Sequence, residues 1–166
     1  MLTSNCTKKW IENLAEQELL IKAGERASID ICTTKEEVLT SETASFIQEL
    51  FVHFENLVGL FNARVNQASL QMKLVRSPEG VEGISVARNQ MRLQLTAVRP
   101  GVIQIHCHKW ASEDPHKPMV MFSALIESQF ETFDDVAWFF LGNQITAEQV
   151  ARHYLTEFIQ ATRTSH

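Results

Sequence analysis

The sequence predicts an α+β domain in which helices pack on one face of an antiparallel sheet. Apolar residues between Phe46 and Val65 recur every three or four positions, as they do along one face of a helix. Between Leu70 and Cys107 the apolar period changes to two, which is the period of strands with one buried side. We therefore expect a single domain over residues 1–166, an antiparallel meander of four to five strands with one long N-terminal helix and two C-terminal helices on one face.

The composition is that of a folded domain. The 166 residues are 45% hydrophobic and 21% charged, with a formal net charge of −5, which excludes a disordered chain. No apolar run approaches the roughly 18–20 residues of a membrane helix, and no secretory signal is recognisable, so we expect a cytoplasmic protein with no membrane partner. The three cysteines, Cys6, Cys32 and Cys107, are widely spaced and predict reduced thiols rather than disulfides or a zinc site.

Besides a short helix at residues 132–141, three helices and one short strand flank the meander in this interpretation. Loosely periodic apolar residues predict a helix over residues 6–21, and residues 28–32 alternate as a brief strand does. The strongest helical pattern predicts a helix over residues 35–64, either unbroken or restarting near Thr40 and Ser41. Thr146 and Gln149 form a capping box, in which a hydroxyl and a side-chain amide satisfy each other's backbone N–H groups, so a helix is expected over residues 146–161.

Turn lengths predict the register of the strands, because residues that face each other across a hairpin share one side of the sheet. We place a three-residue loop at residues 99–101, a two-residue loop at 89–90 and a five-residue loop at 77–81. The apolar residues then face one another: Leu95 with Ile105, Leu93 with Cys107, Ala97 with Ile103, Val86 with Leu93, Ile84 with Leu95, and Leu74 with Ile84. Arg76 is expected opposite Glu82. Turn lengths and apolar faces thus agree.

The C-terminal aromatic residues indicate a contact surface. Residues 119–126 are apolar on both faces and predict a fifth strand with little exposure. Residues 132–141 predict a short helix, capped by Asp134 and Asp135 and ended by Gly142. This helix is apolar nearly all round, so it is either central to the core or meets a partner, for which a homodimer is the commonest solution. The interface candidates are Phe133, Trp138, Phe139 and Phe140.

Charge is distributed unevenly along the chain. Residues 1–63 carry 5 basic and 10 acidic side chains, residues 64–109 carry 7 and 2, and residues 110–166 carry 3 and 8. The net charges of the three segments are therefore −5, +5 and −5, so the sheet is basic and the helices are acidic. An anionic ligand or single-stranded nucleic acid would find basic, amide and aromatic groups on the polar side of the sheet: Lys73, Arg92, Gln94, Gln104, His106, His108 and Trp110.

One local motif carries metal-binding residue types. His106-Cys-His108, with Gly101 before it and Glu113 after it, resembles the first metal-binding motif of the cupins. That resemblance implies a metal held by the two histidines and the glutamate. Both spacings differ by one from the cupin pattern, a second histidine motif is missing, and Arg92 is expected opposite His108. We therefore expect two solvent-facing histidines without a metal or other cofactor.

No catalytic motif accompanies these features. The sequence contains no nucleophile elbow, zinc-protease signature, phosphate-binding loop or dinucleotide fingerprint. Our first hypothesis is a non-catalytic protein that acts through protein–protein contact, as a homodimer or with another protein partner. The alternatives are an anionic-ligand or nucleic-acid-binding protein that uses the basic sheet face, and a metal-dependent enzyme built on His106 and His108.

Overall fold

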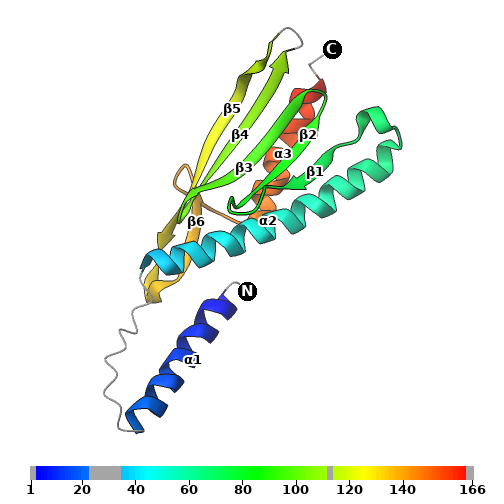
Figure 1. Cartoon of the computed structure of the whole chain (residues 1–166). Coiled ribbons are helices and arrows are strands. Elements are labelled where there is room, and N and C mark those ends of the chain that lie inside the picture. Colours follow the sequence, from blue (N-terminus) through cyan, green and yellow to red (C-terminus); the bar gives the residue numbers. More distant parts are fainter. Residues whose placement is uncertain (1–2, 23–34, 112–113, 164–166) are drawn as a thin grey trace.

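The structure is an α+β fold with a seven-stranded antiparallel sheet (Figure 1). It is a computed structural model that describes residues 3–22, 35–111 and 114–163. The expected strand over residues 28–32, the side chain of Cys6 and Glu113 lie outside this description. In chain order the elements are α1 (Thr3–Lys22), α2 (Lys35–Val65), the 3-10 helix η1 (Ala68–Leu70), β1 (Lys73–Arg76), β2 (Gly83–Arg88), β3 (Met91–Arg99), β4 (Val102–Ala111), β5 (Asp114–Phe130), the 3-10 helix η2 (Thr132–Asp134), β6 (Val136–Phe140), β7 (Asn143–Ile145) and α3 (Ala147–Arg163).

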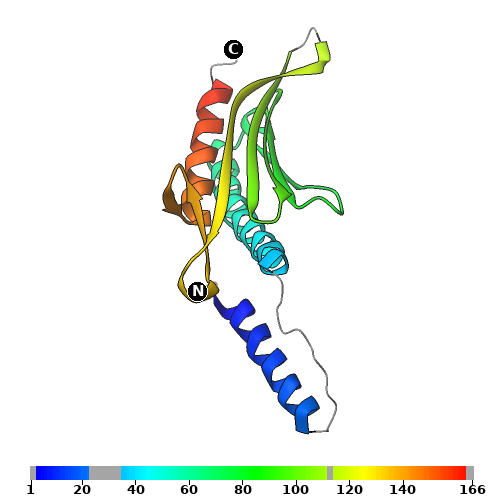
Figure 2. The ribbon, with the colours of Figure 1, turned by 90° about the vertical axis from the view of Figure 1, so that its left-hand side faces the viewer.

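Two helices cover one face of this sheet. The predicted apolar stripe of α2 is buried, with Leu50 and Phe54 fully inaccessible. On α3, Tyr154 and Phe158 join the same core, and the two helices lie on the same side of the curled sheet (Figures 1 and 2). The strands follow one another in chain order across the sheet. Because α2 and α3 lie on one side of it, neither covers the opposite face (Figure 2).

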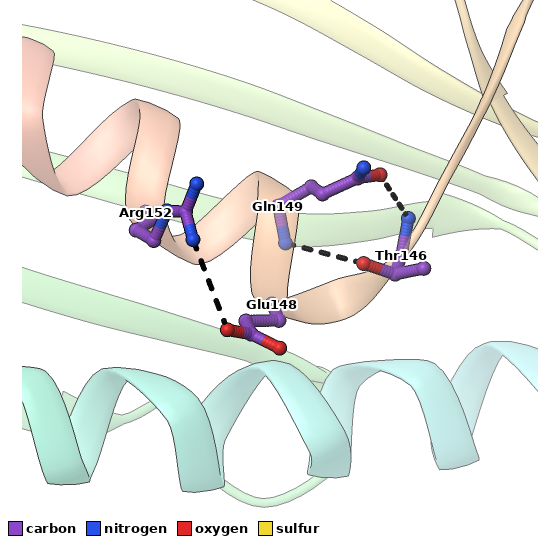
Figure 3. Close-up of polar contacts among 4 residues, drawn as sticks. All are labelled: Thr146, Glu148, Gln149 and Arg152. Atoms are coloured by element: carbon purple, nitrogen blue, oxygen red, sulfur yellow. Dashed lines mark hydrogen bonds and ion pairs between the residues drawn. The ribbon is translucent and has the colours of Figure 1, made fainter.

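The capping box at the start of α3 is confirmed. The Thr146 N–H donates to Oε1 of Gln149 at 3.0 Å, and the Gln149 N–H donates to Oγ1 of Thr146 at 3.3 Å (Figure 3). Each side chain therefore satisfies a backbone group that has no partner in the first turn of a helix. An ion pair between Glu148 and Arg152, at 3.9 Å, is exposed and therefore contributes little to the stability of the helix.

The register of β2, β3 and β4 is as the turn lengths predict. Leu95 pairs with Ile105 and with Ile84, and Leu93 pairs with Cys107. The loop at Asn89 and Gln90 has positive φ at both residues, 49° and 61°, which is the geometry of a two-residue hairpin turn. At the next turn the chain reverses at Pro100–Gly101, and the register shifts between Ala97 and Arg99.

The predicted register of β1 is wrong by two residues. Leu74 pairs with Val86, and Arg76 rather than Leu74 pairs with Ile84. The loop does contain five residues, but it begins one residue later, because the Ser77 N–H donates to the carbonyl of Gly83 at 3.0 Å. A shift of two residues keeps each side chain on its own face, so the core assignment of β1 and β2 survives the error.

The predicted helix over residues 132–141 is wrong. The short η2 is followed by β6 and β7, so the sheet has seven strands and only one α-helix follows it among the described residues. Asp134 and Asp135 therefore do not cap an α-helix. Leu141 and Gly142, with φ of 48° and 79°, form the two-residue turn between β6 and β7 rather than a helix end.

A hydrogen-bonded contact joins α2 to the turn between β3 and β4. The buried Oγ1 of Thr43 accepts from the Gly101 N–H at 2.8 Å and donates to the Leu39 carbonyl at 2.6 Å. The Gly101 carbonyl accepts from the N–H of Ser128 in β5 at 2.8 Å. Gly101 has φ of 80°, and a Cβ there would overlap Oγ of Ser128, so this junction requires glycine.

Helix α1 lies apart from the body formed by the sheet, α2 and α3 in both views (Figures 1 and 2). Its extent, Thr3–Lys22, agrees with the prediction. Several of its apolar side chains are exposed: Trp10, Ile11, Leu19 and Ile21. Within the described residues, no helix is long and apolar enough to cross a membrane.

Candidate functional site

The structure brings the predicted ligand-binding residues together on the outer sheet face, by which we mean the side of β1–β5 opposite α2 and α3. Strand pairing sets Arg92 opposite His108, Gln94 opposite His106, and Thr96 opposite Gln104. Lys73 faces Ala87, which in turn faces Arg92. Since neighbouring strands are about 4.8 Å apart, these polar groups form one continuous surface.

Aromatic rings form a row along β4 on this face. The His106 and His108 rings are parallel within 4°, with centroids 5.3 Å apart, and the Trp110 ring lies 6.0 Å from that of His108 at a tilt of 53°. The guanidinium of Arg92 lies over the Trp110 ring at 5.3 Å from its centroid. A guanidinium at this distance is attracted to the ring face, so Arg92 and the ring row act as one unit.

The two histidines differ in their electrostatic environment. Burial lowers the pKa of His108, and the neighbouring His106 lowers it further, because a second positive charge beside it is unfavourable. Nδ1 of His106 is buried and has no hydrogen-bond partner among the described residues. The neutral imidazole is therefore favoured for His108, which stacks on the His106 ring.

The charge around this row is positive in net terms. From Gly83 to Ala111 the sequence contains no acidic residue, and the exposed Arg92 lies beside the row. Acidic side chains gather instead on α2, where burial and the nearby carboxylates of Glu49 and Asp135 raise the pKa of Glu42. Helix and sheet thus carry opposite charges on opposite sides of the core. The acidic residues of α2 are Glu36, Glu37, Glu42, Glu49 and Glu55.

Within the part of the chain that the structure describes, the histidine pair has no further ligands of a metal site. Among the described residues, no group of three or more His, Cys, Asp or Glu side chains is placed to hold a metal ion. Arg92 pairs opposite His108, and its fixed charge opposes a cation there. The buried Cys107 between the two histidines points to the core, where burial raises its thiol pKa to about 11.

The predicted interface residues do not form one patch. Trp138 is buried and stacks on Phe46 with centroids 4.5 Å apart. Phe140 packs edge-on against Tyr154, and Phe139 pairs opposite Glu127 in β5. The remaining candidate is Phe133, which is 93% exposed in η2. The alternation of a strand explains this outcome, since it sends successive aromatic residues to opposite faces.

An apolar flank that the sequence reasoning missed borders the ring row. It consists of three exposed residues of β5: Val120, Met121 and Leu125. Val120 pairs opposite His108, and Leu125 opposite Gln104, so the flank continues the outer sheet face. Residues 119–126 were expected to have little exposure, which is wrong because the helices cover only one side. The sequence did indicate this flank, because residues 119–126 are apolar on both sides of the strand although helices cover only one side.

Comparison with known proteins adds no further assignment. Neither a protein-family model, nor a curated protein, nor a solved structure matches this chain. The function is therefore inferred from the geometry of the outer sheet face.

Proposed function

We propose that the protein binds single-stranded nucleic acid on the outer sheet face and acts as a binding protein rather than an enzyme. The observation that carries this proposal is the stacking of Arg92 on Trp110 beside the parallel rings of His108 and His106. Every base has a flat face that stacks on aromatic side chains, and arginine binds phosphate. The row offers both kinds of contact within one strand and its neighbour.

The spacing of the row suits successive bases. Residues two apart on a strand are about 7 Å apart, so the three rings of β4 extend over roughly 14 Å. Sheets that bind RNA stack two or three bases on such aromatic side chains. Gln94 and Gln104 flank the row on the same face, and their amides can donate to and accept from the edges of splayed bases.

The local charge supports this choice of ligand despite the overall net charge of −5. The acid-free stretch from Gly83 to Ala111 forms β2, β3 and β4, so no carboxylate of these strands faces a bound phosphate. Lys73 and Arg92 are exposed fixed cations of the face. Two phosphate contacts predict a salt dependence of log K on log salt with a slope of about −1.4.

Fluorescence anisotropy with labelled oligo(dT) and oligo(U) tests the proposal. We expect the Trp110→Ala variant to bind at least tenfold more weakly, because loss of one stacking contact costs about 1–3 kcal/mol. The Lys73→Ala/Arg92→Ala variant should lose most of its salt dependence. The matched controls are Trp10→Ala on α1 and Lys117→Ala/Arg152→Ala, which remove an exposed tryptophan and two exposed cations elsewhere. Equal losses in variants and controls, or no binding by the wild type at low salt, contradict the proposal.

A second candidate, self-association, is favoured by β5. This strand pairs with β4 as far as Asp114 but with β6 only from Glu127 to Phe130. Within the described strands, residues 119–126 therefore have a strand partner on one side only, and such an edge can accept another strand. Pro115 and Pro118 limit pairing at one end of β5, which leaves the apolar flank as the part that can join β5 of a second copy.

Analytical ultracentrifugation tests this homodimer. We expect a concentration-dependent dimer that the Met121→Pro variant converts to monomer, since proline removes a backbone donor and disfavours strand addition. Val98→Pro at the irregular end of β3 is the control for a proline in an exposed sheet position. A wild type that stays monomeric at all concentrations rules out the dimer and leaves the nucleic-acid proposal standing.

A further inference from the structure

The edge of β5 that faces away from β4 is open beside the ring row. Strand β6 occupies this edge only from Glu127 onward, and Figure 1 shows the upper part of β5 at the rim of the sheet, with no strand of the described chain beyond it. On the outer sheet face, Ser123 pairs opposite His106, and Val120 pairs opposite His108. A strand that pairs with this edge therefore lies two strand spacings, about 10 Å, from the strand that carries the rings.

The sequence of this edge fits an antiparallel copy of itself. Met121 forms a bulge that has no facing residue in β4, and the other seven residues of 119–126 alternate between the two sides of the sheet. Antiparallel pairing about a twofold axis at Ser123 keeps each of these side chains on its own side and sets Ser123 opposite its own copy. The other facing pairs, each formed twice, are Val120 with Leu125, Phe122 with Ala124, and Met119 with Ile126.

The ends and the charges of this run also match those of a second copy. At Glu127, where β6 takes over the edge, the facing residue of the other copy is Pro118, which has no N–H to donate and so ends the pairing. Residues 119–126 carry no charge, so no like charges meet across the axis. The exposed Lys117 of each copy comes to the end at which the exposed Glu127 of the other lies. An open, apolar edge bounded by opposite charges is thus complementary to itself.

We propose that two copies joined through β5 form one binding surface with two ring rows, an inference that rests on the proposed binding of single-stranded nucleic acid. A twofold axis perpendicular to the sheet keeps the outer sheet faces of both copies on the same side. The strands then follow in the order β4, β5, β5, β4, so the ring rows are three strand spacings, about 14 Å, apart. Because the axis reverses the direction of one row, the surface takes two segments of opposite polarity, as in a single strand that turns back between the rows.

Disulfide cross-linking tests the pairing of the two copies. In a Cys6→Ser/Cys32→Ser background, Ser123→Cys places two thiols at the axis, where the Cα atoms of a facing pair are about 4.5–5.5 Å apart, which is within the range of a disulfide. We expect mild oxidation to convert this variant to a covalent dimer. Leu125→Cys is the matched control on the same strand and the same face; it faces Val120 rather than its own copy and should stay monomeric on a denaturing gel. A Ser123→Cys variant that does not cross-link, or equal cross-linking of both variants, overturns the pairing.

Fluorescence anisotropy with oligo(dT) of two lengths tests the joint surface. A length of about 4 nucleotides covers one ring row, whereas about 16 nucleotides reach both rows, which lie about 14 Å apart. The longer oligonucleotide should bind the wild-type dimer at least tenfold more tightly than it binds the Met121→Pro variant, because its second segment binds at the effective concentration that the first one sets. The shorter oligonucleotide should bind both proteins equally.

The outcomes separate this inference from the proposed function. Equal affinity of the longer oligonucleotide for the dimer and for the Met121→Pro variant overturns the joint surface. The oxidised Ser123→Cys dimer, compared with its reduced form at concentrations too low for association, repeats the measurement without a proline and must give the same gain. Failure of the shorter oligonucleotide to bind either protein contradicts the nucleic-acid proposal itself, whereas a missing cross-link with intact binding of the shorter oligonucleotide contradicts only the pairing through β5.

Discussion

The Thr43→Val substitution tests whether the junction between α2 and the β3–β4 turn stabilises the fold. Valine keeps the shape of threonine but has no hydroxyl. The variant therefore loses the bond from the Gly101 N–H to Oγ1, 2.8 Å in the wild type, and the bond from Oγ1 to the Leu39 carbonyl. The Leu39 carbonyl still accepts the helical N–H four residues on, whereas the buried Gly101 N–H has no other acceptor.

The expected loss of stability follows from that single unsatisfied donor. A buried backbone N–H without a partner costs about 1–3 kcal/mol. For a domain of this size each kcal/mol lowers Tm by about 2–4 °C, so the variant should unfold about 2–12 °C below the wild type. Differential scanning calorimetry and urea denaturation both measure this change.

Thr40→Val is a closely matched control in the same helix. The Thr40 hydroxyl also donates to the carbonyl four residues earlier, that of Glu36, at 2.8 Å, but it is exposed and accepts no bond from the sheet. We expect a change within about 0.5 kcal/mol, as for other exposed substitutions. If the two variants lose equal stability, or if Thr43→Val loses none, the reasoning about this junction is refuted.

Three further outcomes are expected. In a Cys6→Ser/Cys32→Ser background, Cys107 should react with a thiol reagent only after denaturation, since it is fully buried and its pKa is raised to about 11; fast reaction of the folded protein contradicts this. Because the pKa of folded His108 is lowered, the unfolded chain takes up its proton first as pH falls below about 6.5. Stability should therefore decrease with acidification, less steeply in His108→Gln by urea midpoints at several pH values; parallel curves argue against it. Leu141→Asn should stabilise the protein by about 1 kcal/mol, because asparagine tolerates the positive φ of 48° better than leucine; a lower urea midpoint contradicts this.

The sequence predicted the centre of the sheet well because local rules decide it. Short turns such as Asn89–Gln90 fix which residues face each other, and each apolar alternation has a helix-covered side. The residues of the outer sheet face followed directly, since Arg92 and His108 are set opposite each other by the same turn arithmetic. The ring row and the stacking of Arg92 on Trp110 could not be predicted, because they depend on the twist of the folded sheet and on the side-chain rotamers.

The sequence-based prediction was wrong where a short apolar run is compatible with both a helix and a strand. Residues 136–140 are apolar throughout, and periodicity cannot separate a buried helix from a strand over such a length. The strand is favoured because Trp138 can then stack on Phe46 in the core. These two residues are far apart in the sequence, so no local pattern predicts their contact.

The order of the strands has a consequence for how the chain folds. Since every strand pairs with its neighbour in the sequence, the sheet can form hairpin by hairpin with short loops to close. The core, however, combines Phe54 from before the sheet with Phe158 from after it. We therefore expect docking of α3 against α2 to come last, because until α3 is made the part of the sheet's apolar side that α3 covers stays exposed. Folding intermediates that bind chaperones should be those in which α3 is undocked.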